Sequence, residues 1–283
     1  SLSEATELTG LFIDRGPVVQ VKDAFGKIEV EEDPDPHVVY EGPMAVLVDR
    51  NSASASEIFA GAIQDYKRGI VIGEPTFGKG TVQTLVDLNR FIPGSDEDLG
   101  RLRLTMAQFF RINGGSTQHR GVVPDILFPT AKDASEHGER ALNNAIPWAH
   151  IEPALYAPKG VGAYARLRDR SQERVAVDSG FSMLSEQARL LREMDETTFV
   201  SLNEKKRREE SDRREKLLKT QKNSFLLSQG ITPREDDEDD EDIEAKEKEQ
   251  DAISGIQLDE AARILADFIA MEAENRPRAA MRN

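Results

Sequence analysis

The sequence predicts an α/β fold, a mixed sheet with helices, followed by a mainly α-helical and highly charged C-terminal region. Three observations predict this class. Met44–Val48 is a continuous apolar run, as expected of a strand buried on both faces of a parallel or mixed sheet. A helical pattern opening at Ser54 separates it from a second apolar run, Gly69–Gly73. Charged residues are concentrated after residue 200.

The first predicted element is a β-hairpin. Val18–Val21 and Lys27–Val30 flank Asp23-Ala24-Phe25-Gly26, which has the residue types of a hairpin turn. Two antiparallel strands are therefore expected ahead of the apolar run Met44–Val48.

The helix that follows is predicted to run from Ser54 to about Arg68, with Gly69 placed to end it. Its apolar residues recur at helical spacing: Ile58, Phe59, Ala62, Ile63 and Tyr66. Later elements of the same unit are three predicted strands, a turn and a short extended segment: Gly69–Gly73, Thr81–Leu88, Arg101–Ile112, Asn113–Ser116 and Val122–Leu127.

The 283 residues exceed the usual size of one domain, which favours a packed core with an appended region. We expect a core over residues 1–130, a connecting segment over 131–180 and a helical region over 181–283. Self-repulsion within the acidic run 235–251 predicts a solvated, disordered linker. A helical stripe near the C-terminus is expected to dock onto the protein's own body: Leu258, Ala261, Ala262, Leu265, Phe268 and Ile269.

The net charge of -15 argues against binding of nucleic acid or an anionic membrane, because such surfaces are basic. The basic stretch Lys205–Lys222 is interleaved with acidic residues and indicates a solvated helix. The sequence has no apolar run of a length that predicts a transmembrane helix, so an integral membrane protein is not expected. The absence of cysteine excludes a disulfide framework, a thiolate metal site and a cysteine nucleophile. The sequence starts without a methionine or a signal-peptide pattern, so we expect a fragment.

The segment Ser52-Ala53-Ser54-Ala55-Ser56-Glu57 places serines between a buried strand and a helix. Backbone N–H groups in the first turn of a helix have no intrahelical partner. The Ser54 hydroxyl could attack a carbonyl there, while the N–H of Ala55 points at the developing oxyanion. This hypothesis requires a general base.

Lys79 is the candidate base, because none of the 4 histidines lies in a pattern typical of serine hydrolases. A lysine acts as a base only when its amine is neutral, which apolar surroundings favour. Lys79 follows the apolar Ile70–Ile72 and lies between two glycines. Ser/Lys pairs are a known variant of nucleophilic catalysis.

Two further residues are candidates for supporting roles. Gln83 would share a face with Lys79 in an extended segment, so its amide oxygen could orient the amine. Asp65 lies close to the helix face of Ser54 but roughly 16 Å along the axis, which predicts a supporting residue that reaches a neighbouring loop.

Two other interpretations of these motifs stay open. Ser54-Ala55-Ser56-Glu57 is also a capping box, which would make Ser54 an ordinary helix cap. Gly73-x-x-x-x-Gly78-Lys79-Gly80-Thr81 nearly matches a nucleotide-binding P-loop. A P-loop must lead into a helix, whereas Thr81–Leu88 alternates like a strand.

Three stretches together resemble the tail-specific, or carboxyl-terminal processing, serine proteases: Val46–Arg50, Ser52–Ala60 and Gly73–Gln83. The downstream segments Phe109–Gln118 and Gly121–Ile126 also resemble that family. The family's nucleophile, helix aspartate, lysine and lysine-orienting glutamine fall on these residues: Ser54, Asp65, Lys79 and Gln83. The charged remainder resembles the C-terminal region of the Gram-negative, periplasmic branch.

The resemblance implies a periplasmic endopeptidase that captures apolar, unstructured C-termini of proteins through a PDZ domain, without metal or cofactor. Nothing in this sequence resembles the PDZ domain or the glycine-rich turn that supplies the second oxyanion donor, so hydrolysis by this chain alone is not expected. A third hypothesis, a noncatalytic helical module that binds a regulatory partner, fits residues 180–283 better than the front half. The sequence identifies no such partner.

Overall fold

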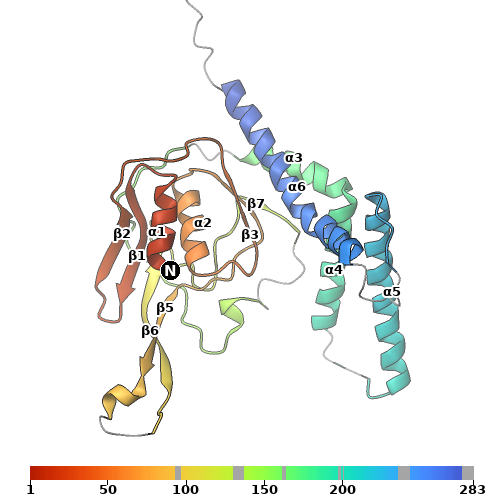
Figure 1. Ribbon diagram of the computed structural model, residues 1–283, viewed down its shortest axis with the longest axis horizontal. Helices are drawn as coiled ribbons and strands as arrows, with labels where there is room; N and C mark the ends of the chain where they lie inside the picture. Colours follow the sequence, from red (N-terminus) through yellow and green to blue (C-terminus); the bar gives the residue numbers. More distant parts are fainter. Residues whose placement is uncertain are drawn as a thin grey trace, which may run out of the picture. The chain divides into compact units, whose positions relative to one another are not determined.

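A computed structural model provides the structure, which describes residues 1–92, 97–129, 137–160, 164–196, 199, 201–234 and 243–275. Strands dominate the first half and helices the second (Figure 1). The α/β class with a helical C-terminal region is therefore confirmed. The described residues form two compact units. Those of the first unit fall within 1–71, 75–124 and 134–162, and those of the second fall within 72–74, 125–133 and 163–283.

The first sheet is antiparallel and has the strand order β2-β1-β6-β5. Its strands are β1 (Gly16–Asp23), β2 (Ile28–Asp33), β5 (Thr81–Asp87) and β6 (Arg101–Phe110). β1 and β2 form the predicted hairpin, with Gln20 opposite Val30. The short 3-10 helix η1 (Leu88–Phe91) follows β5.

Two helices lie against this sheet (Figure 1). α1 (Leu2–Gly10) and α2 (Ala55–Asp65) enclose a core with residues of β1 and β6. The core comprises Ala5, Ile13, Val18, Val19, Ile58, Ala62, Tyr66, Phe109 and Ile112. α2 ends at Asp65, three residues before the predicted end at Arg68, and the left-handed Lys67, with φ of 51°, stops the chain from continuing the helix.

The second sheet has the order β3-β4-β7. It comprises β3 (Ala45–Val48), β4 (Ile70–Gly73) and β7 (Ile126–Leu127), and β4 pairs in parallel with β7. Every residue of β4 is buried, as predicted. The prediction that Met44–Val48 is buried on both faces is wrong, because β3 is an edge strand whose Leu47 is 42% exposed. A smaller core of Val48, Ala60, Val71 and Val122 packs α2 onto β3 and β4.

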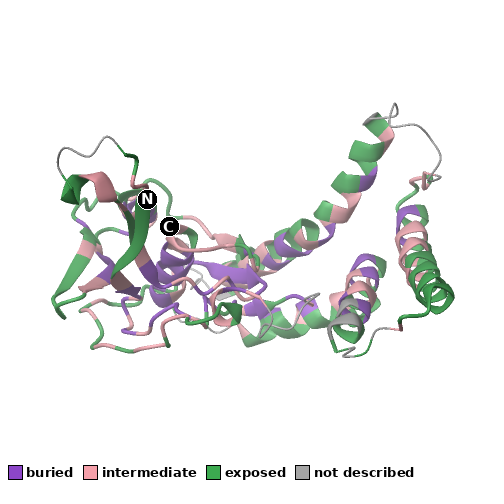
Figure 2. Ribbon diagram, turned by 90° about the horizontal axis from the view of Figure 1, so that it is seen from below, coloured by how far each residue is buried: buried purple, intermediate pink, exposed green. Residues whose placement is uncertain are grey.

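The second unit is mainly helical. Its helices are α3 (Ala165–Val177), α4 (Ser179–Asp195), α5 (Glu204–Ser228) and α6 (Ile243–Asn275). These helices carry long exposed faces (Figure 2). The expected solvated helix over Lys205–Lys222 is confirmed, since it falls in α5 and is mostly exposed. No helix in the described ranges is long and apolar enough to cross a membrane. The first unit also contains η2 (Glu139–Ala141).

The buried face of α6 matches the predicted stripe only in part. Ala261 is buried as predicted, whereas Leu258 is 61% exposed, and the other buried residues are Ile256, Glu260 and Ile264. The difference arises because Glu260 pairs with Arg174 of α3 at 2.8 Å, and Arg174 also binds Asp267 at 2.7 Å. An ion pair with a residue so distant in sequence places a carboxylate where an apolar residue is expected.

The predicted acidic linker is wrong for residues 243–251, which form the first turns of α6. Glu249 is buried and pairs with Lys222 of α5 at 2.6 Å, and it also accepts the backbone N–H of Arg234 at 2.9 Å. These contacts offset the repulsion among neighbouring carboxylates. The other part of that run, residues 235–242, lies outside the described residues.

Candidate active site

Ser54 occupies the turn between β3 and α2, directly before the first helical residue, Ala55. Its backbone has φ of 58° and ψ of −113°, which differs from the extended conformation of an ordinary N-cap. A serine with positive φ carries strain of about 1–3 kcal/mol and persists only where its surroundings hold it. Such strain is typical of functional turns, so the contacts that hold Ser54 are informative.

The preceding residues form a closed hydrogen-bonded turn around Asp49. The Asp49 carboxylate accepts the backbone N–H of Asn51 at 3.0 Å and that of Ser52 at 2.8 Å. The Ser52 hydroxyl donates to the same carboxylate at 2.9 Å and accepts the Asp49 N–H at 3.1 Å. Ser52 is therefore engaged within its own turn, which separates its role from that of Ser54.

Glu57 is 0% exposed and connects the serine to the lysine. Its Oε2 accepts the backbone N–H of Ser54 at 2.8 Å and the backbone N–H of Lys79 at 3.0 Å. Its Oε1 accepts the N–H of Gly78 at 2.7 Å and the hydroxyl of Thr76 at 2.5 Å. One carboxylate oxygen thus holds the backbones of Ser54 and Lys79 side by side.

The ionisation state of Glu57 is central to this arrangement. All four contacts are donated to the carboxylate, so they require its ionised form. Burial raises the pKa of Glu57 above its ordinary value, and the hydrogen bonds from Thr76 and three backbone N–H groups oppose that rise. Protonation therefore begins at a higher pH than for an exposed glutamate.

Residues 75–80, here called the lysine loop, are also held by the segment 116–122. Thr76 exchanges two hydrogen bonds with Val122, and the His119 N–H donates to the Gly78 carbonyl at 2.9 Å. Gly78 has φ of +88°, and a Cβ there would lie 3.0 Å from the His119 backbone. A glycine is therefore required beside Lys79. The chain turns tightly here, as predicted from the glycines that flank Lys79.

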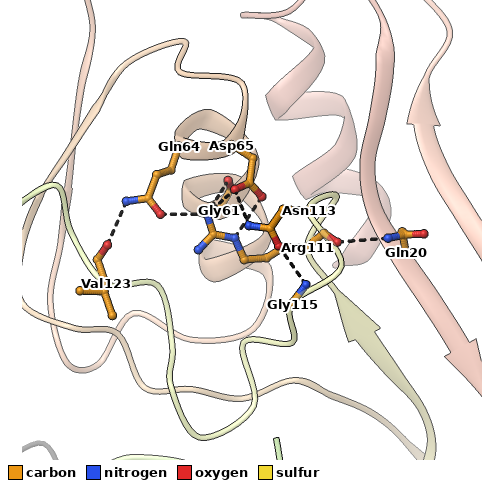
Figure 3. A network of polar contacts seen from close by, with 8 residues as sticks. All are labelled: Gln20, Gly61, Gln64, Asp65, Arg111, Asn113, Gly115 and Val123. Atoms are coloured by element: carbon orange, nitrogen blue, oxygen red, sulfur yellow. Dashed lines mark hydrogen bonds and ion pairs between the residues drawn. The ribbon is translucent and has the colours of Figure 1, made fainter. Parts of the chain in front are cut away.

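Asp65 reaches the end of β6 rather than Ser54 (Figure 3). Its carboxylate binds the Arg111 guanidinium through two nitrogens, at 2.6 and 3.0 Å, and accepts the Asn113 amide at 2.8 Å. Burial raises the pKa of Asp65, against the lowering effect of Arg111. Asp65 thus anchors the turn that leads into segment 116–122.

This anchoring predicts the effect of Asp65→Asn. The substitution keeps the size of the side chain but leaves a largely buried guanidinium without its carboxylate, which should lower the free energy of unfolding by about 3–5 kcal/mol. Denaturant unfolding measures the change. Asn113→Ala is the matched control, which removes a neutral partner and should cost about 1–3 kcal/mol. Equal, small losses from both variants would contradict the anchoring role.

The surroundings of Gln83 are less regular than the sequence predicts. Gln83 is exposed, and β5 has a register shift between Val82 and Gln83. Lys79 itself precedes the strand. The expectation of a shared face assumed uninterrupted alternation, so the lysine-orienting role of Gln83 stays a prediction. The oxyanion role of the Ala55 N–H also stays a prediction; that group lies in the first turn of α2, where intrahelical acceptors are absent.

The P-loop interpretation is wrong. Lys79 leads into β5 instead of a helix, so no helix N-terminus is available for phosphates. The N–H groups of Gly78 and Lys79, which would cradle phosphate oxygens, donate to Glu57 instead.

Two contributions to the site were missed from the sequence. The sequence pattern identifies Glu57 as the second residue of a capping box, and the structure confirms that its side chain accepts the Ser54 N–H. The pattern gave no sign of its bonds to the lysine loop, because those partners lie about 20 residues away. The contacts from segment 116–122 are equally nonlocal.

Comparisons with known proteins identify related families and sequences. Peptidase family S41 matches residues 1–128, and the C-terminal domain of tail specific protease (DUF3340) matches residues 132–270. A tail-specific protease of Haemophilus influenzae is 41% identical over 282 residues, which are 98% of this chain and 39% of that protein. A carboxy-terminal-processing protease of Bartonella bacilliformis is 31% identical over 65% of this chain and 41% of its own length.

Among solved structures, a photosystem II D1 C-terminal processing protease aligns with a TM-score of 0.40 and 34% identity, over 45% of this chain and 31% of that one. The chain spans about two fifths of the length of the two curated relatives.

Proposed function

This chain belongs to peptidase family S41, and on that premise we propose that it carries the nucleophile and the general base of a serine endopeptidase. Ser54 is the nucleophile and Lys79 the base. The observation that carries this assignment is the shared Oε2 of Glu57, which accepts one backbone N–H from each of the two residues. Two residues 25 positions apart are thereby held next to each other.

In the proposed acylation step, the neutral amine of Lys79 takes the hydroxyl proton of Ser54 as Oγ attacks the peptide carbonyl carbon. The carbonyl oxygen becomes an oxyanion, and the N–H of Ala55 donates to it. Lys79 then returns the proton to the leaving amine as the C–N bond breaks. The products are an ester on Ser54 and a free amino terminus.

In the deacylation step, Lys79 is neutral again and takes a proton from water, whose oxygen attacks the ester. The acyl–oxygen bond to Ser54 breaks, Oγ recovers a proton from Lys79, and the carboxylic acid product leaves. Asp65 takes no part in proton transfer, because its carboxylate is occupied by Arg111 and Asn113.

The proposal extends to the substrate and the compartment. We assign cleavage to proteins recognised through apolar C-terminal tails in the periplasm; resemblance to the tail-specific proteases supports both parts. A second oxyanion donor and the tail-binding domain are assigned to the remainder of the intact protein, since the relatives are longer than this chain.

Tail dependence has a direct test with the intact protein. Two protein substrates that differ only in their final residues, apolar in one and aspartate in the other, are compared by kcat/KM. Burial of one large apolar side chain contributes about 1.5–3 kcal/mol, so the apolar tail should give roughly a tenfold to hundredfold higher value. Equal cleavage of both, abolished in Ser54→Ala, would remove the apolar-tail proposal and leave the peptidase assignment.

A further inference from the structure

The lysine loop is in contact with a second buried polar side chain besides Glu57. Gln118 is 1% exposed and belongs to segment 116–122. Its Oε1 accepts the backbone N–H of Gly80, the residue after Lys79, at 2.8 Å. The preceding Thr117 hydroxyl donates to the Lys79 carbonyl at 3.4 Å. The peptide group that joins Lys79 to Gly80 is therefore fixed at both its oxygen and its nitrogen.

Glu139 determines which way the Gln118 amide points. The Gln118 Nε2 donates to the Glu139 Oε1 at 3.1 Å. An ionised carboxylate only accepts hydrogen bonds, so the NH₂ group must face Glu139 and the amide oxygen must face Gly80. Reversing the amide would place a donor against the Gly80 N–H and an oxygen against the carboxylate.

The segment that carries Glu139 is itself fastened to the lysine loop. The Glu139 N–H donates to the Phe77 carbonyl at 3.0 Å, and the Phe77 and His137 rings lie edge to face at 5.8 Å. Gly138 has φ of +82°, and a Cβ there would lie 2.2 Å from the Phe77 oxygen. Glu139 is thus placed accurately enough to orient an amide.

We propose that Gln118, oriented by Glu139, is a positioning residue for Lys79: it fixes the Lys79–Gly80 peptide and so the direction in which the lysine side chain leaves the backbone. The proposal rests on the proposed function, in which Lys79 is the base. Glu57 fixes the N–H of Lys79 and Gln118 the peptide after it, so the two side chains restrain Lys79 from both ends.

Gln118→Glu in the intact protein is the first test. Near neutral pH the substitution places two carboxylates in contact, and their repulsion should displace the lysine loop. A misplacement of about 1 Å in a catalytic group can lower kcat about 100-fold, whereas KM should stay within about twofold because Gln118 does not touch substrate.

The pH profile of the same variant distinguishes positioning from general damage. Two adjacent carboxyl groups share a proton with a raised pKa. Once one proton is bound, the new carboxyl can donate to Glu139 and still accept the Gly80 N–H, which restores the wild-type pattern. The ratio of variant to wild-type kcat should therefore rise as pH falls, a recovery that a merely damaged fold would not show.

Exchange of the two side chains is the rescue experiment. Gln118→Glu combined with Glu139→Gln again pairs one amide with one carboxylate, and the carboxylate still accepts the Gly80 N–H. The double variant should recover kcat to within about tenfold of wild type. Gln118→Met, which has similar length but no acceptor, should lower kcat about 100-fold at every pH. It also keeps the test open if Gln118→Glu fails to fold.

Either of two results would overturn the proposal: wild-type kcat in a folded Gln118→Met, or a double variant no better than Gln118→Glu alone. Both presuppose that the wild type cleaves protein in a manner that requires Ser54 and Lys79. Cleavage that survives Ser54→Ala would refute the proposed function itself, so the two failures are distinguishable.

Discussion

Replacing Ser54 with alanine in the intact protein is expected to abolish proteolysis, with kcat lower by about 10⁴-fold or more. The substitution removes the only atom that forms the covalent intermediate in the proposed mechanism. Lys79→Ala should have an effect of the same order, because the hydroxyl then has no base, and the two losses should not add in the double variant. Steady-state cleavage of a protein substrate measures all three.

Neighbouring serines provide the matched controls. Ser52→Ala removes the hydroxyl that bonds Asp49 and should lower stability by about 1 kcal/mol while substantial activity remains. Ser56→Ala should also retain activity. An equal loss at Ser52 would show that the wrong serine has been assigned. Thermal unfolding of each variant separates lost chemistry from a lost fold.

Glu57→Gln is expected to have the second largest effect. The amide offers one acceptor oxygen, and its NH₂ group would face groups that now donate. Thr76 can turn its hydroxyl to accept, but at least one buried backbone N–H loses its acceptor, at a cost of about 1–3 kcal/mol. Displacement of Ser54 relative to Lys79 should lower kcat about 100-fold.

The same substitution in the helical unit is the control. Glu260 is as buried as Glu57 and is held by Arg174. Glu260→Gln should therefore reduce stability without lowering kcat. A comparable loss of kcat in Glu260→Gln would show that the effect at Glu57 reflects general destabilisation.

The pH dependence of kcat follows from the raised pKa of Glu57. Activity requires the ionised carboxylate, so acidification removes activity as pH falls through this pKa. Protonation of this single group lowers kcat in acid with a slope of about one in log kcat per pH unit. The Glu57→Gln variant lacks this titrating carboxylate, so its log kcat should fall less steeply in acid than that of the wild type. The same slope of log kcat against pH on the acid side in wild type and variant would contradict the role of Glu57.

Much of the fold could be predicted because its signals are local. The hairpin of β1 and β2, the buried strand β4 and the helix after Ser54 each follow from apolar periodicity and turn residues within short windows. The exposed edge of β3 was not predictable, since an apolar run does not say whether a strand lies at the centre or the edge of a sheet.

The site residues likewise differ in whether a local sequence signal predicts them. Ser54 and Lys79 stand out because each lies in a recognisable segment. The side chains that fix them do not, because Glu57 has a complete local explanation as a helix cap. Gln118 ends a segment that resembles the family, but nothing in that segment indicates its contact with Gly80. Buried carboxylates such as Glu260 are missed for a related reason: their burial depends on a cation supplied from far along the chain.

Ser54 and Lys79 act together in the proposed mechanism, and a crystal structure of the intact protein with a bound peptide boronate would test this pairing directly. We expect a boron–oxygen bond to the Ser54 Oγ, the Lys79 Nζ within about 3–4 Å of that oxygen, and a boronate oxygen accepting the Ala55 N–H. A bond to any other residue, or a Lys79 amine directed into solvent, would contradict it.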